Sequence, residues 1–189
     1  MYFDFSNWYL RSPRRRHRLA GAVDGSRFSH GASARQVLDV QSNIATTYQK
    51  LGRLEEARQI YREVYSGWLK LDGEEHAHSL LAANNYGATL IHLKRFEEAR
   101  SLLRKTIPVA RRVLKESHDI TLRIRWSYAR ALCLDPRATL DDLREAATTL
   151  EDAARIARRV MGGAHPLADG IEIHLRLSRA ALDARENSA

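Results

Sequence analysis

Three histidines of this chain recur at intervals that suggest chemistry. His76 and His118 are 42 residues apart, His165 follows 47 residues later, and His78 stands close to the first of them. Imidazole nitrogens bind zinc and other transition metals, so His76 and His78 suggest a metal site. No His-Glu-x-x-His pattern accompanies them, however, and no second histidine follows at i+4. We therefore expect the recurring histidines to cap or pack between structural units, with no metal and no cofactor bound.

Paired carboxylates form the second candidate for chemistry, because two neighbouring acids can perform general acid–base catalysis. They occur as Glu55-Glu56 and Glu97-Glu98. Adjacent residues of a helix point in different directions, however, and the helix dipole favours acids in a first turn, so we interpret both pairs as structural. The single cysteine, Cys133, has no charged activator at fixed spacing. With no phosphate-binding glycine loop and no nucleophile elbow, the protein is predicted not to be an enzyme.

The elements that position these residues are predicted to be helices. Ala, Glu, Lys, Leu and Arg make up 93 of the 189 residues, a share typical of long or repeated helices. Four prolines and ten glycines are too few for an all-β fold with many turns. A single cysteine excludes an intramolecular disulfide framework and favours a reducing compartment.

The formal net charge of +8 and the pI near 10.0 suggest nucleic acid or an anionic membrane as a partner. Residues 1–35 carry a net charge of +5, however, whereas the remaining 154 residues carry only +3. We therefore predict two regions: a basic, disordered N-terminal arm at 1–33 and a folded domain at 34–189. The arm contains a cluster of basic residues, namely Arg14, Arg15, Arg16 and Arg18.

Several roles are open to this basic cluster. Blocks of like charge are usually solvated and disordered, which favours a tail with no dedicated partner. The alternatives are a nucleic-acid, acidic-lipid or nuclear-targeting patch, or part of an organellar transit peptide. No run of the sequence approaches the roughly 18 apolar residues that a membrane span needs. We expect a soluble, cytoplasmic protein, or an organellar one if the arm is a transit peptide.

A 42-residue repeat is the strongest pattern in the sequence. Residues 51–58 align with residues 93–100 at this offset, and residues 143–146 align as a third copy once five residues are inserted at 135–139. The apolar periodicity predicts two helices in each unit and an unpaired helix at the end. The predicted first helices are 34–50, 76–93 and 118–134, the second helices are 54–71, 96–115 and 140–161, and the last helix is 166–184. Gly52 is suited to the first tight turn, and Thr139-x-x-Asp142 resembles a capping box.

These units resemble the tetratricopeptide repeat family. Each first helix carries a small core residue, and each second helix carries an Ala-x-x-x-large pair such as Ala57 with Tyr61. The long period, the Asn-rich first helices and the histidine that opens each next unit are similar to the kinesin-light-chain subtype. The resemblance covers about residues 34–185 and implies an all-α, right-handed solenoid of about three and a half antiparallel helix pairs. Arg176 stands where a small residue is usual, which implies that the last helix is a solvent-facing cap.

The resemblance also implies a function. It predicts a non-catalytic adaptor that binds a peptide segment of a partner protein in a concave groove formed by the first helices. Arginines, amides and an indole there would suit an acidic or mixed-charge peptide. No heptad coiled coil accompanies the repeats, so attachment to a kinesin motor is not expected. The alternative is a helical-repeat protein that binds nucleic acid through the arginine-rich arm. The groove positions implied by the family are Ser42, Thr46, Gln49, Asn84, Asn85, Ala88, Ile91, Arg123, Trp126, Arg130 and Cys133.

Overall fold

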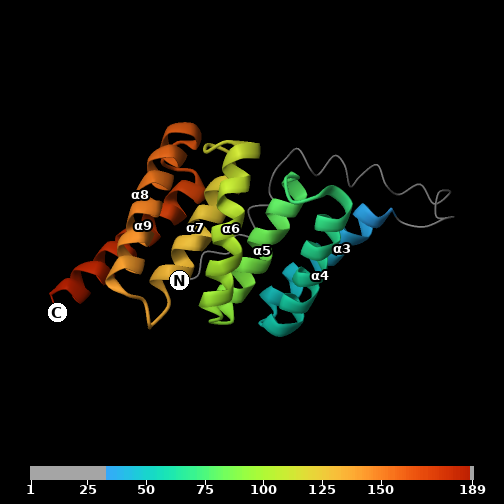
Figure 1. Cartoon of the computed structure of the whole chain (residues 1–189), viewed down its shortest axis with the longest axis horizontal. Helices are drawn as coiled ribbons and strands as arrows, with labels where there is room; N and C mark the ends of the chain where they lie inside the picture. Colours follow the sequence, from blue (N-terminus) through green and yellow to red (C-terminus); the bar gives the residue numbers. More distant parts are fainter. Residues whose placement is uncertain (1–32, 188–189) are drawn as a thin grey trace.

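The computed structural model describes residues 33–187, and this part of the chain forms seven helices and no strand (Figure 1). Every helix boundary lies within two residues of its predicted position. Each helix packs against the next one in the chain, so the pairs stack side by side along the long axis of the molecule. The helices are α3 (Ala34–Lys50), α4 (Leu54–Asp72), α5 (Ala77–His92), α6 (Phe96–Leu114), α7 (Asp119–Cys133), α8 (Leu140–Met161) and α9 (Pro166–Glu186).

The recurring histidines begin three of these helices. His76, His118 and His165 are the N-caps of α5, α7 and α9. In each case the ring Nδ1 accepts a hydrogen bond from the backbone N–H two residues later, at 3.3, 3.2 and 3.2 Å respectively. A free N–H at the start of a helix needs such an acceptor, so the predicted capping role is confirmed.

The turns inside the repeats use left-handed backbone at equivalent positions. Gly52 has a φ of 76° and Lys94, one repeat later, has a φ of 59°. Glycine adopts this conformation without the steric cost that a side chain adds, so the expected role of Gly52 in the first tight turn is confirmed.

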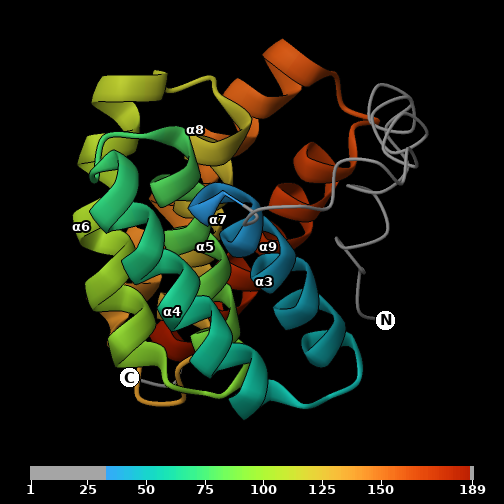
Figure 2. The same ribbon diagram turned by 90° about the vertical axis from the view of Figure 1, so that its right-hand side faces the viewer.

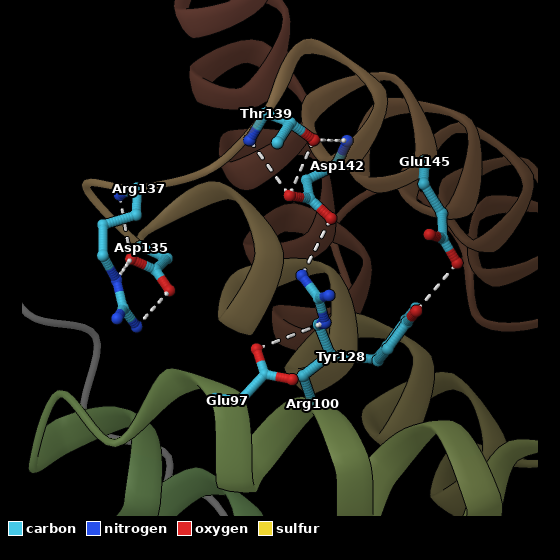
Figure 3. A network of polar contacts seen from close by, with 8 residues as sticks. All are labelled: Glu97, Arg100, Tyr128, Asp135, Arg137, Thr139, Asp142 and Glu145. Carbon is cyan, nitrogen blue, oxygen red and sulfur yellow. Dashed lines mark hydrogen bonds and ion pairs between the residues drawn. The ribbon is translucent and has the colours of Figure 1, made fainter.

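The five-residue insertion of the third repeat forms a longer turn between α7 and α8, and polar contacts hold it in place (Figure 3). Thr139 forms the predicted capping box with Asp142, whose side chain accepts from the Thr139 backbone at 3.0 Å. The other carboxylate oxygen of Asp142 accepts a 2.8 Å hydrogen bond from Arg100 of α6, and Asp135 pairs with Arg137 inside the turn. The end of the insertion is therefore tied to α8 through Thr139, and α8 is tied to the preceding repeat through Asp142 and Arg100.

Small residues let the helices of each pair approach closely. Ala45 and Ala129 have no exposed surface, and they occupy the same repeat position as Gly87. A Cβ added to Gly87 would meet the Leu103 side chain at 2.9 Å, which is too close for an undisturbed contact. A large apolar core extends over α5 to α9, whereas α3 and α4 contribute to two small clusters. No helix in the described part of the chain is long and apolar enough to span a membrane.

Candidate functional site

The first helices of the pairs, α3, α5, α7 and α9, are called A helices here, and α4, α6 and α8 are called B helices. Seen along the stack, α3, α5 and α7 lie on one side of α4 and α6 (Figure 2). Helix α7 packs against both α5 and α9, whereas successive B helices have few contacts with each other. Helices on the inside of a curved stack are closer together than those on the outside, so α5, α7 and α9 form the inner side, and α3 continues their side of the stack.

The inner side holds a cluster of aromatic and cationic groups around α7. The guanidinium of Arg130 lies 5.7 Å from the centre of the Trp126 ring, within the range of a cation–π contact. The ring of His174, from α9, meets the Trp126 ring edge-on at a centroid distance of 5.3 Å. Trp126 is buried, and its ring packs against both of these polar groups. We call these three residues, together with His92 at the end of α5, the Arg130 cluster.

Arg130 differs from the other arginines of its helix in having no acidic partner. Arg123 lies 3.6 Å from Asp119, and Arg125 lies 3.1 Å from Glu116. Among residues 33–187, no carboxylate forms an ion pair with Arg130, and its Nε is buried without a hydrogen-bond partner. Arg130 is half-buried, and a guanidinium with a buried, unsatisfied Nε and no carboxylate partner in this part of the chain is suited to bind an anion from outside.

The titratable groups of the cluster respond to partial burial and to the charge of Arg130. Burial lowers the pKa of Arg130. Burial, followed by the charge of Arg130, lowers the pKa of His92, and the same two causes outweigh a hydrogen bond to the Gly170 carbonyl and lower the pKa of His174. Both imidazoles are therefore held towards their neutral form.

The remaining predicted groove residues are distributed unequally along the inner side. Thr46 is half-buried, donates to the Ser42 carbonyl at 2.9 Å and lies 2.7 Å from the Tyr61 hydroxyl. Asn84 is buried, and its side-chain oxygen accepts a 3.0 Å hydrogen bond from Ser127, so it joins α5 to α7. Ile91 is buried as well, whereas the half-buried positions are Ser42, Gln49, Asn85, Ala88, Arg123 and Cys133.

Sequence reasoning missed His92 and His174. The repeat register could have found His174, because it occupies the position of the predicted groove residue Asn85 two repeats later. His92 directly follows the predicted groove position Ile91 in the chain. The arm residues Arg14, Arg15, Arg16 and Arg18 lie outside the described residues.

A surface pocket also lies on the other side of α7, between α6 and α8. It is basic as well, because Arg104, Arg111 and Arg125 line it together with Glu145 and Asp152. Its most buried cation, Arg125, interacts with the carboxylates of Glu116 and Asp152. The charge of Arg125 is therefore balanced within the protein, in contrast to that of Arg130.

Comparison with known proteins places these repeats in a family. Two overlapping segments, residues 36–111 and 79–135, match the family model of the tetratricopeptide repeat. The chain belongs to the tetratricopeptide repeat family. This family consists of repeat modules for protein–protein interaction, and such folds are typically non-enzymatic scaffolds. Among curated proteins, none matches this tetratricopeptide repeat (TPR) chain.

Solved structures extend the similarity to kinesin-light-chain-type repeats at the level of the fold. The nearly identical TPR-like repeats of a Podosopora anserina kinesin light chain superpose with a TM-score of 0.69 at 22% identity, over 80% of this chain and 69% of that one. A variant of that protein gives a TM-score of 0.70 over the same shares. BtubC (BKLC) from P. vanneervenii gives 0.63 at 14% identity, over 85% of this chain and 66% of the other. These similarities establish the all-α helical-repeat solenoid.

Proposed function

We propose that this TPR protein is a non-catalytic adaptor whose inner side binds an extended, acidic peptide segment of a partner protein. The observation that carries the proposal is Arg130, a half-buried residue whose Nε is buried without a hydrogen-bond partner and which has no carboxylate partner among residues 33–187. The family supports a protein partner, and the charge of the Arg130 cluster supports an acidic one.

Each member of the cluster has a distinct role in this proposal. Arg130 forms a charge-assisted hydrogen bond with a Glu or Asp side chain of the peptide, and its low-dielectric surroundings strengthen that bond. Trp126 keeps the guanidinium in place through the cation–π contact. His174 becomes easier to protonate once the carboxylate offsets the charge of Arg130, and it then adds a second positive donor.

The test uses the full chain and an array of labelled peptides that vary in acidic content. Each peptide is paired with a copy in which Glu and Asp are replaced with Gln and Asn. We expect wild-type protein to prefer the acidic copies and Arg130→Gln to lose about tenfold or more of that binding. The matched control is Arg176→Gln on α9, because the exposed Arg176 occupies the position that faces a B helix in the other repeats.

Two results would contradict the proposal. One is equal binding of the acidic and amide copies by wild-type protein, and the other is undiminished binding by Arg130→Gln. A titration of the His174 ring by NMR gives a second readout, because its pKa should rise when an acidic peptide binds. Nucleic-acid binding through the basic arm stays a prediction from the charge of residues 1–35.

A further inference from the structure

The three junctions between a B helix and the next A helix differ in two positions. At the second junction, Leu114 ends α6, and at the third, Met161 ends α8; both pack against the large apolar core. The second residue of the following helix is apolar and buried in each case, namely Ile120 and Leu167. At the first junction these two positions are Asp72 and His78. The first junction therefore has an acid and an imidazole at the two positions where the second and third junctions, its sister junctions, each have a pair of apolar residues.

The N-cap histidine of the first junction completes a three-residue cluster. Potential ligand atoms of Asp72, His76 and His78 all lie within 4.8 Å of one another. Asp72 Oδ2 is 3.4 Å from His76 Nδ1 and 3.7 Å from His78 Nδ1. No second histidine follows these two at i+4, but Asp72 precedes His76 by four residues across the turn between α4 and α5.

Asp72 is the unusual member of this cluster. Only 3% of its side chain is exposed, and its Oδ2 is buried without a hydrogen-bond partner among residues 33–187. Its other oxygen, Oδ1, accepts a hydrogen bond from Arg35, which fixes the orientation of the carboxylate. Burying a carboxylate oxygen without a hydrogen-bond partner costs free energy. A cation bound between this oxygen and the two imidazoles would supply the missing partner.

The two histidines keep this position open to solvent. Their side chains are 46% and 48% exposed, so an ion can reach the cluster from outside. The ring of His78 packs on Trp68 at a centroid distance of 4.3 Å, which restrains one ligand. The cap bond of His76 is long, at 3.3 Å, so a metal that took its Nδ1 would displace only a weak interaction.

We propose that Asp72, His76 and His78 bind a divalent transition-metal ion of the zinc class at the first repeat junction. Two imidazoles and a carboxylate are ligands that zinc accepts in tetrahedral sites, and small movements would bring them to coordination distance. Three protein ligands leave one position for water or for a group from a partner molecule. Arg35 acts on the site through Asp72 by orienting its carboxylate.

The experiment titrates metal-free, full-length protein with zinc chloride in competition with a chromophoric chelator. Two variants carry the residues of the sister junction, Asp72→Leu and His78→Ile, and these residues are compatible with the fold because α6 and α7 use them at the same positions. We expect one zinc ion per wild-type chain and a loss of affinity of about tenfold or more in each variant. The matched control, His118→Ala, removes an N-cap histidine outside the cluster and should leave zinc affinity unchanged.

Thermal unfolding provides the second readout. Zinc should raise the Tm of wild-type protein and of His118→Ala, but not that of Asp72→Leu or His78→Ile. Circular dichroism at 222 nm checks that each variant is folded. If Asp72→Leu loses helicity, the zinc affinity and Tm of His78→Ile alone test the proposal. The proposal is overturned if wild-type protein binds no zinc, or if both folded variants bind it as tightly as wild type through other histidines of the chain.

Discussion

Helices α3 and α7 occupy the same place in their repeats, yet they are buried to very different extents. In α3 only Leu38 and Ala45 are buried, and Val37, Val40 and Ile44 are each more than two-fifths exposed. In α7 eleven of the fifteen residues are buried, including a charged one, Arg125. Helix α3 packs mainly on α4, whereas α7 is surrounded by α5, α6, α8 and α9.

This difference shows that a repeat motif by itself does not decide how deeply its residues are buried. Both helices place a small residue against the following B helix, at Ala45 and Ala129. Of these two helices, only α7 has a neighbouring repeat on each side, and there Arg125 and the Nε of Arg130 are buried. The Arg130 cluster therefore depends on the position of α7 within the stack.

The largest expected effect concerns one leucine that recurs in the A helices. Leu122 of α7 is fully buried, and the equivalent Leu38 of α3 is 8% exposed beside a much smaller cluster. Replacing Leu122 with Ala should lower the free energy of unfolding by about 3–5 kcal/mol, because the surrounding helices cannot close the cavity. We expect Leu38→Ala to cost about 2 kcal/mol, since the end of the stack relaxes more easily. Urea unfolding monitored by circular dichroism measures both values, and equal losses would contradict the comparison.

A smaller effect is expected where a methyl group is added between helices. Gly87→Ala places a Cβ about 2.9 Å from Leu103 and should cost about 1–3 kcal/mol of unfolding free energy. Gly163→Ala is the matched control, because its nearest neighbour, an Arg158 side-chain carbon, is 4.0 Å away. The control should change stability by less than about 0.5 kcal/mol. A cost for Gly163→Ala as large as that for Gly87→Ala would show that contact with Leu103 is not the cause, because the reduced flexibility of the unfolded chain by itself stabilises the folded protein.

The smallest expected effect is a change in one titration. Burial, together with a 2.7 Å hydrogen bond to Glu145, raises the pKa of Tyr128 in α7 to about 12. The stability that this tyrosine contributes is fully present below the unfolded pKa of about 10 and is lost as the pH rises towards 12. Glu145→Gln should move the pKa of Tyr128 towards 10 while burial keeps it above that value. Ultraviolet difference absorption at high pH follows this group, and an unchanged pKa would remove Glu145 as a cause.

Much of the fold followed from local patterns. The helix boundaries, the turn at Gly52, the N-cap histidines and the capping box at Thr139 are all confirmed. These features depend on residues a few positions apart, so a single sequence is enough to predict them. The exposure of Arg176 on α9 follows in the same way, because an arginine is not accommodated in a position that requires a small buried residue.

The candidate sites were less predictable, since they combine residues from different repeats. The groove positions Trp126 and Arg130 came from the family resemblance, but His174, which packs on Trp126, comes from another helix. Asn84 stays a predicted groove position, and its buried side chain joins α5 to α7 through Ser127. Such pairings are about one repeat apart in the chain, and only the stacking geometry decides which side chains meet.

The sequence by itself determined the repeat, its helices and their caps, because periodic apolar residues and local hydrogen bonds act within a single unit. The tertiary structure decided which polar groups are removed from water. Arg130 lies without an ion-pair partner among residues 33–187, and Asp72 is buried beside two histidines, because neighbouring helices close over these positions. Burial depends on every element that packs around a residue, and both proposed sites arise from that dependence.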